Sequence, residues 1–190
     1  MAYLPSLPEN ASLLDVFRMF PETNEPLLVF HETLLRGPSP FTEAERELVA
    51  AYVSGLNGCR YCHGVHMATA ERLGIEPGAI TSLLQNGHSS AIPGNMSPVL
   101  NIAKKLTMRA DGVTQADADA VFAAGWSETA FYHLVAVVAL FNYMNRLVEG
   151  LGIELNPAYA QTAAKRLADR GYRPLIEMMH KSAATVSKNN

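Results

Sequence analysis

The only two cysteines of the 190-residue chain, Cys59 and Cys62, are separated by two residues and lie close in sequence to a histidine and an acid. His66 follows Cys62 by four positions, and Glu47 precedes Cys59 by twelve. Two thiols in a C-x-x-C arrangement can cycle between dithiol and disulfide, and a nearby imidazole can take up the thiol proton. The spacing therefore points first to redox chemistry.

The predicted start of a helix strengthens this interpretation. Asn57 and Gly58 indicate the end of one helix, so Cys59 is expected at or near the N-terminus of the next. Unpaired backbone N–H groups and the helix dipole favour a thiolate there. Steps of three and four residues place Cys59, Cys62 and His66 on one helical face. His66 can then act as the base for Cys62, and the two cysteines can approach closely enough to form a disulfide.

These residues suggest a mechanism with assigned roles. A thiolate attacks the distal oxygen of a peroxide and becomes a sulfenic acid while an alcohol leaves. The second cysteine condenses with the sulfenic acid to form a disulfide, and an external dithiol restores both thiols. Glu47 would hold His66 in the useful tautomer, directly or through a water, provided that the chain folds back at Asn57 and Gly58.

The elements that must position these residues are all predicted to be helices. No segment alternates cleanly enough for a strand, and the capping signals indicate an all-α protein with about nine helices. Asn24 is expected to cap an early helix. Thr42 and Glu45 form a capping box at the start of the helix that carries Glu47. Ser127 is expected to cap the longest helix, which ends near residue 149.

The overall composition narrows the class of function. The net charge is −3 and no basic run is present, which argues against nucleic acid as a partner. The start of the chain lacks the pattern of a secretory signal, and the longest apolar run, residues 134–141, is too short to span a bilayer. We therefore expect a cytoplasmic protein without a membrane partner, whose thiols are catalytic, redox-sensing or metal-binding. Charged residues are only 17% of the chain, which favours a homo-oligomer.

The second half of the chain contains a weak internal echo of the first. Two short segments recur, residues 48–50 as 134–136 and residues 73–76 as 151–154. In this alignment His133 takes the position of Glu47, and Asn145 takes the position of Cys59. A duplication and a chance match both explain these short repeats.

The pattern E-x11-C-x-x-C-x3-H, with Asn-Gly before the first cysteine, resembles the alkylhydroperoxidase D (AhpD) and carboxymuconolactone decarboxylase family, in its peroxidase-related branch. The resemblance implies an AhpD-like helical bundle forming one domain over residues 1–190. In this interpretation residues 1–40 are an N-terminal helical extension, and residues 41–76 form the C-x-x-C core. Residues 127–155 would be a degenerate second copy if the duplication is real.

The same resemblance implies a thiol-dependent alkylhydroperoxide reductase of antioxidant defence, with Cys62 as the peroxide-reactive thiol and Cys59 as its resolving partner. Glu47 and His66 would form the proton relay. The resemblance implies a homotrimer or homohexamer without haem, flavin or metal, reduced by an external dithiol of the thioredoxin or lipoyl type. Helix-dipole reasoning alone favours Cys59 as the more acidic thiol. We follow the resemblance because His66 lies one turn from Cys62.

One departure from the family pattern affects the auxiliary residues. In alkylhydroperoxidase D a histidine lies between the two cysteines, whereas here that position is Tyr61 and a histidine follows as His63. We therefore expect only auxiliary roles for Tyr61 and His63. His133 is either a core histidine or a neighbour of the site. Decarboxylase members generally lack the cysteine pair, which argues against lactone decarboxylation.

Three alternatives remain open at this point. The cysteines could be ordinary core residues, because free cysteine is among the most buried residue types. Glu47, Cys59, Cys62 and His66 could bind zinc, although structural zinc prefers more thiolate or imidazole ligands. The protein could also be a non-enzymatic redox sensor or adaptor whose disulfide switches an oligomer or partner surface. The sequence gives His31 no assigned role and suggests that Phe141 is core packing.

Overall fold

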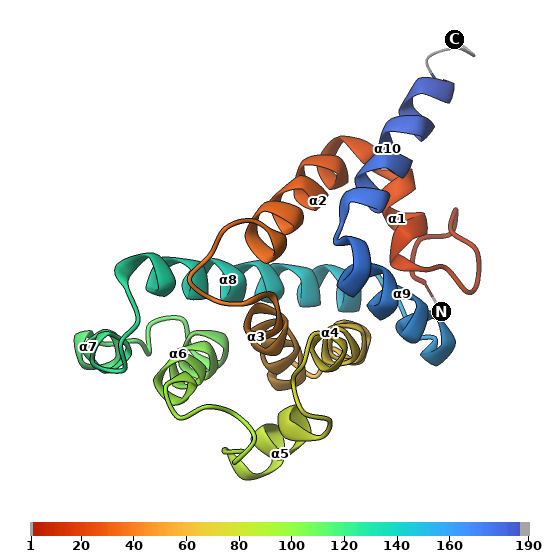
Figure 1. Ribbon diagram of the computed structural model, residues 1–190. Helices are drawn as coiled ribbons and strands as arrows, with labels where there is room; N and C mark the ends of the chain where they lie inside the picture. The colour runs from red at the N-terminus through yellow and green to blue at the C-terminus, as the bar shows by residue number, and fades with distance from the viewer. Residues whose placement is uncertain (1, 187–190) are drawn as a thin grey trace.

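The computed structural model describes the backbone of residues 2–186 and the side chains of residues 2–180. Within this part of the chain there are ten α-helices and no strand (Figure 1). In chain order the helices are α1 (Leu13–Met19), α2 (Pro21–Arg36), α3 (Glu43–Leu56), α4 (Arg60–Arg72), α5 (Ala79–Asn86), α6 (Met96–Met108), α7 (Gln115–Ala123), α8 (Glu128–Gly150), α9 (Pro157–Arg170) and α10 (Arg173–Val186). The all-α prediction is confirmed.

The predicted number of helices, about nine, is one too low, and the predicted start of α2 is wrong. Only Phe20 separates α1 from α2, because Pro21 occupies the first helical position, where its missing N–H is not needed. Asn24 therefore lies inside α2 rather than capping it. Its Nδ2 donates to the carbonyl of Phe20 at 2.8 Å, one turn back, and the side chain is buried.

α3 is the central helix of the arrangement. The predicted capping box is present: Thr42 Oγ1 accepts from Glu45 N at 3.2 Å, and the Glu45 carboxylate accepts from Thr42 N at 2.8 Å. The interior of α3 is rich in small residues, and Ala50 and Ala51 are completely buried. Small side chains allow close approach, and α3 packs against α4, α6 and α8 (Figure 1).

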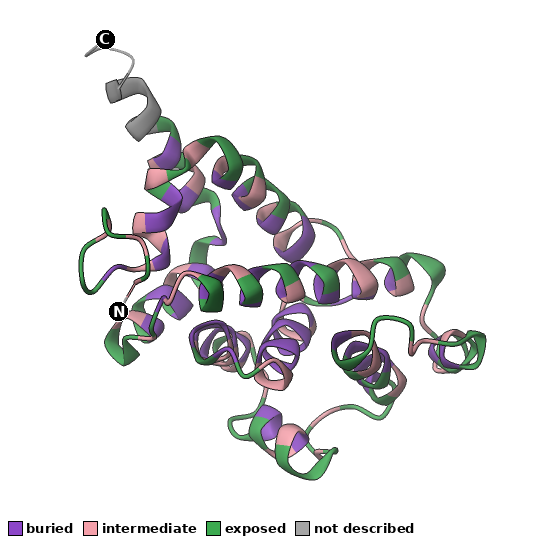
Figure 2. Ribbon diagram, turned by 180° about the vertical axis from the view of Figure 1, so that it is seen from behind, coloured by how far each residue is buried: buried purple, intermediate pink, exposed green. Residues whose placement is uncertain are grey.

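α8 crosses the molecule over α3 and is the longest helix of the described chain (Figure 1). Ser127 caps it as predicted, accepting from Ala130 N at 3.2 Å. Among the described helices it alone is long and apolar enough to cross a membrane by length and composition. One side of it is nevertheless buried against the neighbouring helices while the other is exposed (Figure 2), as in an amphipathic helix that packs on a protein core.

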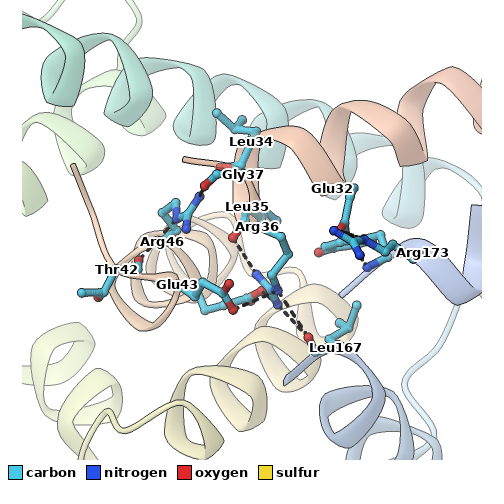
Figure 3. A network of polar contacts seen from close by, with 12 residues as sticks. Glu32, Leu34, Leu35, Arg36, Gly37, Thr42, Glu43, Arg46, Leu167 and Arg173 are labelled. Atoms are coloured by element: carbon cyan, nitrogen blue, oxygen red, sulfur yellow. Dashed lines mark hydrogen bonds and ion pairs between the residues drawn. The ribbon is translucent and has the colours of Figure 1, made fainter. Parts of the chain in front are cut away.

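Helices from both halves of the described chain pack together beside α4. α9 packs along α4, α10 lies beside α2, and α1 contacts both α2 and α10 (Figure 1). Glu32 joins α2 to the start of α10, because its carboxylate accepts from Tyr172 N at 2.7 Å and binds Arg173 Nε at 2.9 Å (Figure 3). The helices at the ends of the sequence therefore form a cover over the C-x-x-C segment.

Candidate redox active site

The turn between α3 and α4 places the first cysteine at a helix start, as predicted. Gly58 adopts φ +71°, a left-handed conformation that glycine takes at little cost. Cys59 is the N-cap residue of α4, and its backbone N–H donates to Ser54 O at 3.0 Å. The chain thus folds back on itself, and α4 packs closely against α3.

The two cysteines are free thiols, and both are buried. A hydrogen bond between the two side chains, helped by the backbone N–H of Cys62, lowers the pKa of Cys59 although burial opposes this. The same hydrogen bond and burial raise the pKa of Cys62 well above its usual value. Cys59 is therefore the more acidic thiol, in agreement with the helix-dipole argument.

Asn145 of α8 lies beside the cysteine pair. A hydrogen bond from its side chain partly offsets the rise in the pKa of Cys62. Its Nδ2 also donates to Ser54 Oγ at 3.0 Å, and its Oδ1 accepts from Asn57 Nδ2 at 2.9 Å. Asn145 is the residue that aligns with Cys59 in the internal echo.

Glu47 and His66 form a direct pair between α3 and α4. Glu47 Oε2 lies 2.6 Å from His66 Nδ1, and the carboxylate is completely buried. Because a carboxylate only accepts, Nδ1 carries the proton and Nε2 is the ring nitrogen left for proton exchange. Burial alone would raise the pKa of Glu47, but the charges and hydrogen bonds of His66 and Arg36 outweigh it and lower that pKa.

Arg36, at the end of α2, is a site residue that the sequence analysis missed. Its Nη2 donates to Glu47 Oε1 at 2.6 Å, and the side chain is only 6% exposed. The same guanidinium reaches the carbonyl of Leu167 in α9 and lies 3.5 Å from Glu43 (Figure 3). The attraction of Glu47 raises the pKa of Arg36 despite burial, which by itself would lower it. Arg36 thus fixes the acid from behind.

A cavity lies beside His66. Its volume is about 60 Å³, which is room for several water molecules. Cys62 and His66 both line the cavity, whereas Cys59 does not. Apolar side chains from α1, α8, α9 and α10 form most of the remaining wall, and Phe141 is one of them. Phe141 contacts the edge of the His66 ring at 4.5 Å between centroids, so it also helps to hold the imidazole.

His31 of α2 also lines the cavity, although no role was expected for it from the sequence. Its Nδ1 donates to the carbonyl of Leu27 at 2.7 Å. Burial lowers the pKa of His31 to about 4, so the ring is neutral at neutral pH. The ring of Tyr172 packs against it at 5.1 Å, and burial raises the pKa of that tyrosine.

Of the three residues expected to have auxiliary roles, one lines the cavity and two lie outside its wall. Tyr61 lines the cavity next to Tyr159, and burial raises its pKa. His63 instead donates from Nδ1 to the carbonyl of Ala51 at 2.9 Å, and thus ties α4 to α3 outside the cavity wall. His133 is half-buried, with Nδ1 2.9 Å from Ser39 Oγ, and it does not line the cavity.

The described residues provide no group of three or more His, Cys, Asp or Glu side chains placed to hold a metal ion. Glu47, which the zinc hypothesis required as a ligand, already binds Arg36 and His66 through its two oxygens. Both oxygens of Glu47 are thus already engaged by side chains of the protein.

Residues 21–93, which include both cysteines, Glu47 and His66, match the model of the carboxymuconolactone decarboxylase family. The chain is similar to that family over this segment. No curated protein sequence matches the chain.

Two solved structures share the fold. One is an uncharacterized peroxidase-related protein from Silicibacter sp. TM1040, with a TM-score of 0.72 and 24% identity, covering 78% of each chain. The other is an alkylhydroperoxidase AhpD core, an uncharacterized peroxidase-related protein from Ralstonia eutropha JMP134, with a TM-score of 0.71 and 22% identity over the same shares. At this level of identity the likeness concerns the fold, and the predicted AhpD-like helical architecture is confirmed.

Proposed function

We propose that this protein is a thiol-dependent hydroperoxide reductase that removes alkyl hydroperoxides. The observation that supports this most directly is that Cys62 and His66 line one cavity while Glu47 holds His66 from the other side at 2.6 Å. A nucleophile, a base and a group that orients the base are then present at one point.

In the first step His66 Nε2 takes the proton of the Cys62 thiol, and the thiolate attacks the distal oxygen of the hydroperoxide. An S–O bond forms as the O–O bond breaks, and its electron pair leaves with the alkoxide, which takes a proton from His66 and departs as the alcohol. Cys62 becomes a sulfenic acid, so it is oxidised by two electrons while the peroxide is reduced by two.

In the second step the Cys59 sulfur attacks the sulfenic acid of Cys62. A disulfide forms, and the hydroxyl group leaves as water with the proton that Cys59 gives up. An external dithiol of the thioredoxin or lipoyl type then reduces the disulfide by two thiol–disulfide exchanges and is itself oxidised to a disulfide. This cycle uses no haem, flavin or metal.

We assign the attacking and resolving roles to different cysteines. The more acidic thiol is not the thiol that a peroxide in the cavity can reach. The lowered pKa belongs to Cys59, but only Cys62 lines the cavity. A peroxide must reach the sulfur that it oxidises, so we assign the attack to Cys62. The lowered pKa of Cys59 suits it to the resolving step, since a lower pKa makes the attacking thiolate easier to form.

The proposed assembly is a homotrimer or homohexamer in the cytoplasm. Several large apolar side chains are exposed on the single chain, including Phe30 at 46%, Tyr143 at 52% and Tyr132 at 69%. Such side chains would be covered in an oligomer. The cytoplasm would keep both thiols reduced between turnovers.

Turnover with an organic peroxide tests the proposal. Cumene hydroperoxide and dithiothreitol are supplied in excess, and peroxide loss is followed for wild type and Cys62→Ser. We expect repeated turnover by wild type and none by the variant. Equal and slow consumption by both proteins would exclude the enzymatic function.

The complete burial of Cys59 supports a second candidate, a redox sensor whose disulfide changes the protein surface. A sensor would be oxidised once per molecule without sustained turnover, and its elution volume on gel filtration would change on oxidation. A peroxidase would turn over many times and keep its size.

A further inference from the structure

Two buried side-chain atoms have no hydrogen-bond partner among the described residues: Arg166 Nε and the Tyr172 hydroxyl. Arg166 lies in α9, and Tyr172 lies in the turn directly after it, so both belong to the cover over α4. Buried polar groups in native proteins nearly always have a partner, and an unpaired one is costly. A ligand in the cavity would supply the partner that Arg166 Nε lacks, because Arg166 lines the cavity.

Arg166 is the group of the two that reaches the cavity wall. No Asp or Glu side chain lines this cavity, and the other basic groups on its wall are His31 and His66. Other arginines close to the site have partners: Arg36 binds Glu47, and Arg173 binds Glu32. Arg166 has no ion pair among the residues described, so its positive charge is free for an anion.

We propose that Arg166 binds a carboxylate of the peroxide substrate and that the enzyme prefers carboxylate-bearing alkyl hydroperoxides; this assignment rests on the proposed function. The planar guanidinium suits a carboxylate better than any neutral group, because it offers paired N–H donors and a permanent charge. The substrate carboxylate replaces the partner that Nε lacks.

The positions of Arg166 and Cys62 in the cavity determine which way round such a substrate binds. Arg166 is half-buried, whereas Cys62 is 3% exposed, so the charged group lies toward the mouth and the peroxide lies inside. Apolar walls formed by Leu13, Phe17 and Leu167 take the hydrocarbon between them. The substrate that fits this order of contacts has a carboxylate at one end, a hydroperoxide at the other and a hydrocarbon segment between them.

The test compares two hydroperoxides that differ only in charge: the tertiary hydroperoxide of 4-isopropylbenzoic acid and its methyl ester. Uncharged dithiothreitol serves as the reductant, so an effect of charge arises at the peroxide. Wild type should favour the acid over the ester by about ten-fold in kcat/KM. In Arg166→Met the ratio should fall to about one, mainly through KM for the acid, and Arg166→Lys should restore part of it.

Arg170→Met is the matched control, since Arg170 is an exposed arginine of the same helix that does not line the cavity. It should keep the acid preference of wild type. No acid preference in wild type, or the same preference in Arg166→Met, would overturn the assignment. So would an effect of Arg166→Met on the KM of dihydrolipoate alone, because the carboxylate recognised would then belong to the reductant.

A binding measurement separates this inference from the proposed function. In the Cys62→Ser background, 4-isopropylbenzoate should bind with an affinity that falls about ten-fold on adding Arg166→Met, and 4-isopropylbenzamide should show no such dependence. If the carboxylate binds in this way but wild type reduces no hydroperoxide, the anion site is correct and the peroxidase function is wrong. If neutral peroxides turn over but the carboxylate does not bind, the peroxidase function is correct and the anion site is wrong.

Discussion

Glu47 of α3 and His66 of α4 lie nineteen residues apart in sequence, and their side chains meet at 2.6 Å between Oε2 and Nδ1. The carboxylate is completely shielded from solvent and is held from behind by Arg36. The contact fixes the ring tautomer and directs Nε2 away from the acid. This geometry leaves Nε2 free for the proton relay that we propose.

Removing the charge of Glu47 should slow the reaction of the thiol with peroxide. In Glu47→Gln the side chain keeps its size, but it no longer stabilises the imidazolium that forms when His66 takes a proton. We expect the rate of peroxide-dependent oxidation to fall about 100-fold, as for loss of a positioned acid–base group. Stopped-flow measurement of the loss of peroxide under single-turnover conditions would show it.

Glu43→Gln is the control for this variant. Glu43 lies on the same helix and 3.5 Å from the same Arg36, but it is partly exposed and does not contact His66. Its rate should stay within about two-fold of wild type, since exposed ion pairs contribute little. A Glu47→Gln enzyme as fast as Glu43→Gln would refute the relay.

Removing Arg36 should shift the pH dependence of activity. The Arg36 charge helps to lower the pKa of Glu47. In Arg36→Met that pKa rises, so Glu47 becomes protonated at higher pH and the acid limb of the pH–rate profile moves upward. Breaking this buried pair should also reduce the free energy of unfolding by about 3–5 kcal/mol. Arg36→Lys should move the limb back toward wild type.

Arg46→Met separates the electrostatic effect from the structural one. Arg46 is also buried and joins the same two helices, donating to the carbonyls of Leu34 at 2.9 Å and Gly37 at 2.8 Å (Figure 3). Its loss should lower stability without moving the acid limb. An equal shift in both variants would mean that the profile reports folding and not the ionisation of Glu47.

Single-cysteine variants should distinguish the attacking sulfur from the resolving one. In Cys59→Ser, Cys62 should form a sulfenic acid with peroxide that reacts with dimedone, because the cavity still reaches it. In Cys62→Ser, Cys59 should react much more slowly, despite its lowered pKa. Faster labelling of Cys59 would mean that acidity outweighs access and that the assigned roles are reversed.

His31 should make the stability of the protein depend on pH. Burial lowers its pKa to about 4, below the ordinary value of 6.5, so the unfolded state binds more protons between these two pH values. Its contribution is fully present above about pH 6.5 and is lost as the pH falls toward 4, by up to about 3 kcal/mol. Denaturant unfolding of wild type and His31→Asn should show a steeper loss in wild type. Parallel curves would contradict the assigned shift.

The local part of the site could be predicted from the sequence. Asn57 and Gly58 fix the turn that ends α3, and the turn places Cys59 at the start of α4. Helical spacing then puts His66 one turn beyond Cys62. Only the meeting with Glu47 required an assumption about the fold, since it depends on the two helices lying antiparallel.

The surroundings of the site could not be predicted in the same way. Arg36, His31, Arg166 and Tyr172 come from α2, α9 and the turn after α9, and no spacing rule connects these segments to the cysteines. A buried arginine looks in sequence like any basic residue at a helix end. The repeat argument pointed to His133 as well as Asn145, but only Asn145 contacts the cysteine pair. Tertiary packing, rather than periodicity, decides these cases.

Peptide mapping after treatment with one equivalent of cumene hydroperoxide shows directly whether Cys59 and Cys62 act as a redox pair. We expect that wild type forms a disulfide between Cys59 and Cys62, that Cys59→Ser stops at the sulfenic acid of Cys62, and that dithiothreitol returns wild type to two free thiols. Thiols that remain unmodified in wild type, or are oxidised beyond the sulfenic acid without forming this bond, would contradict it.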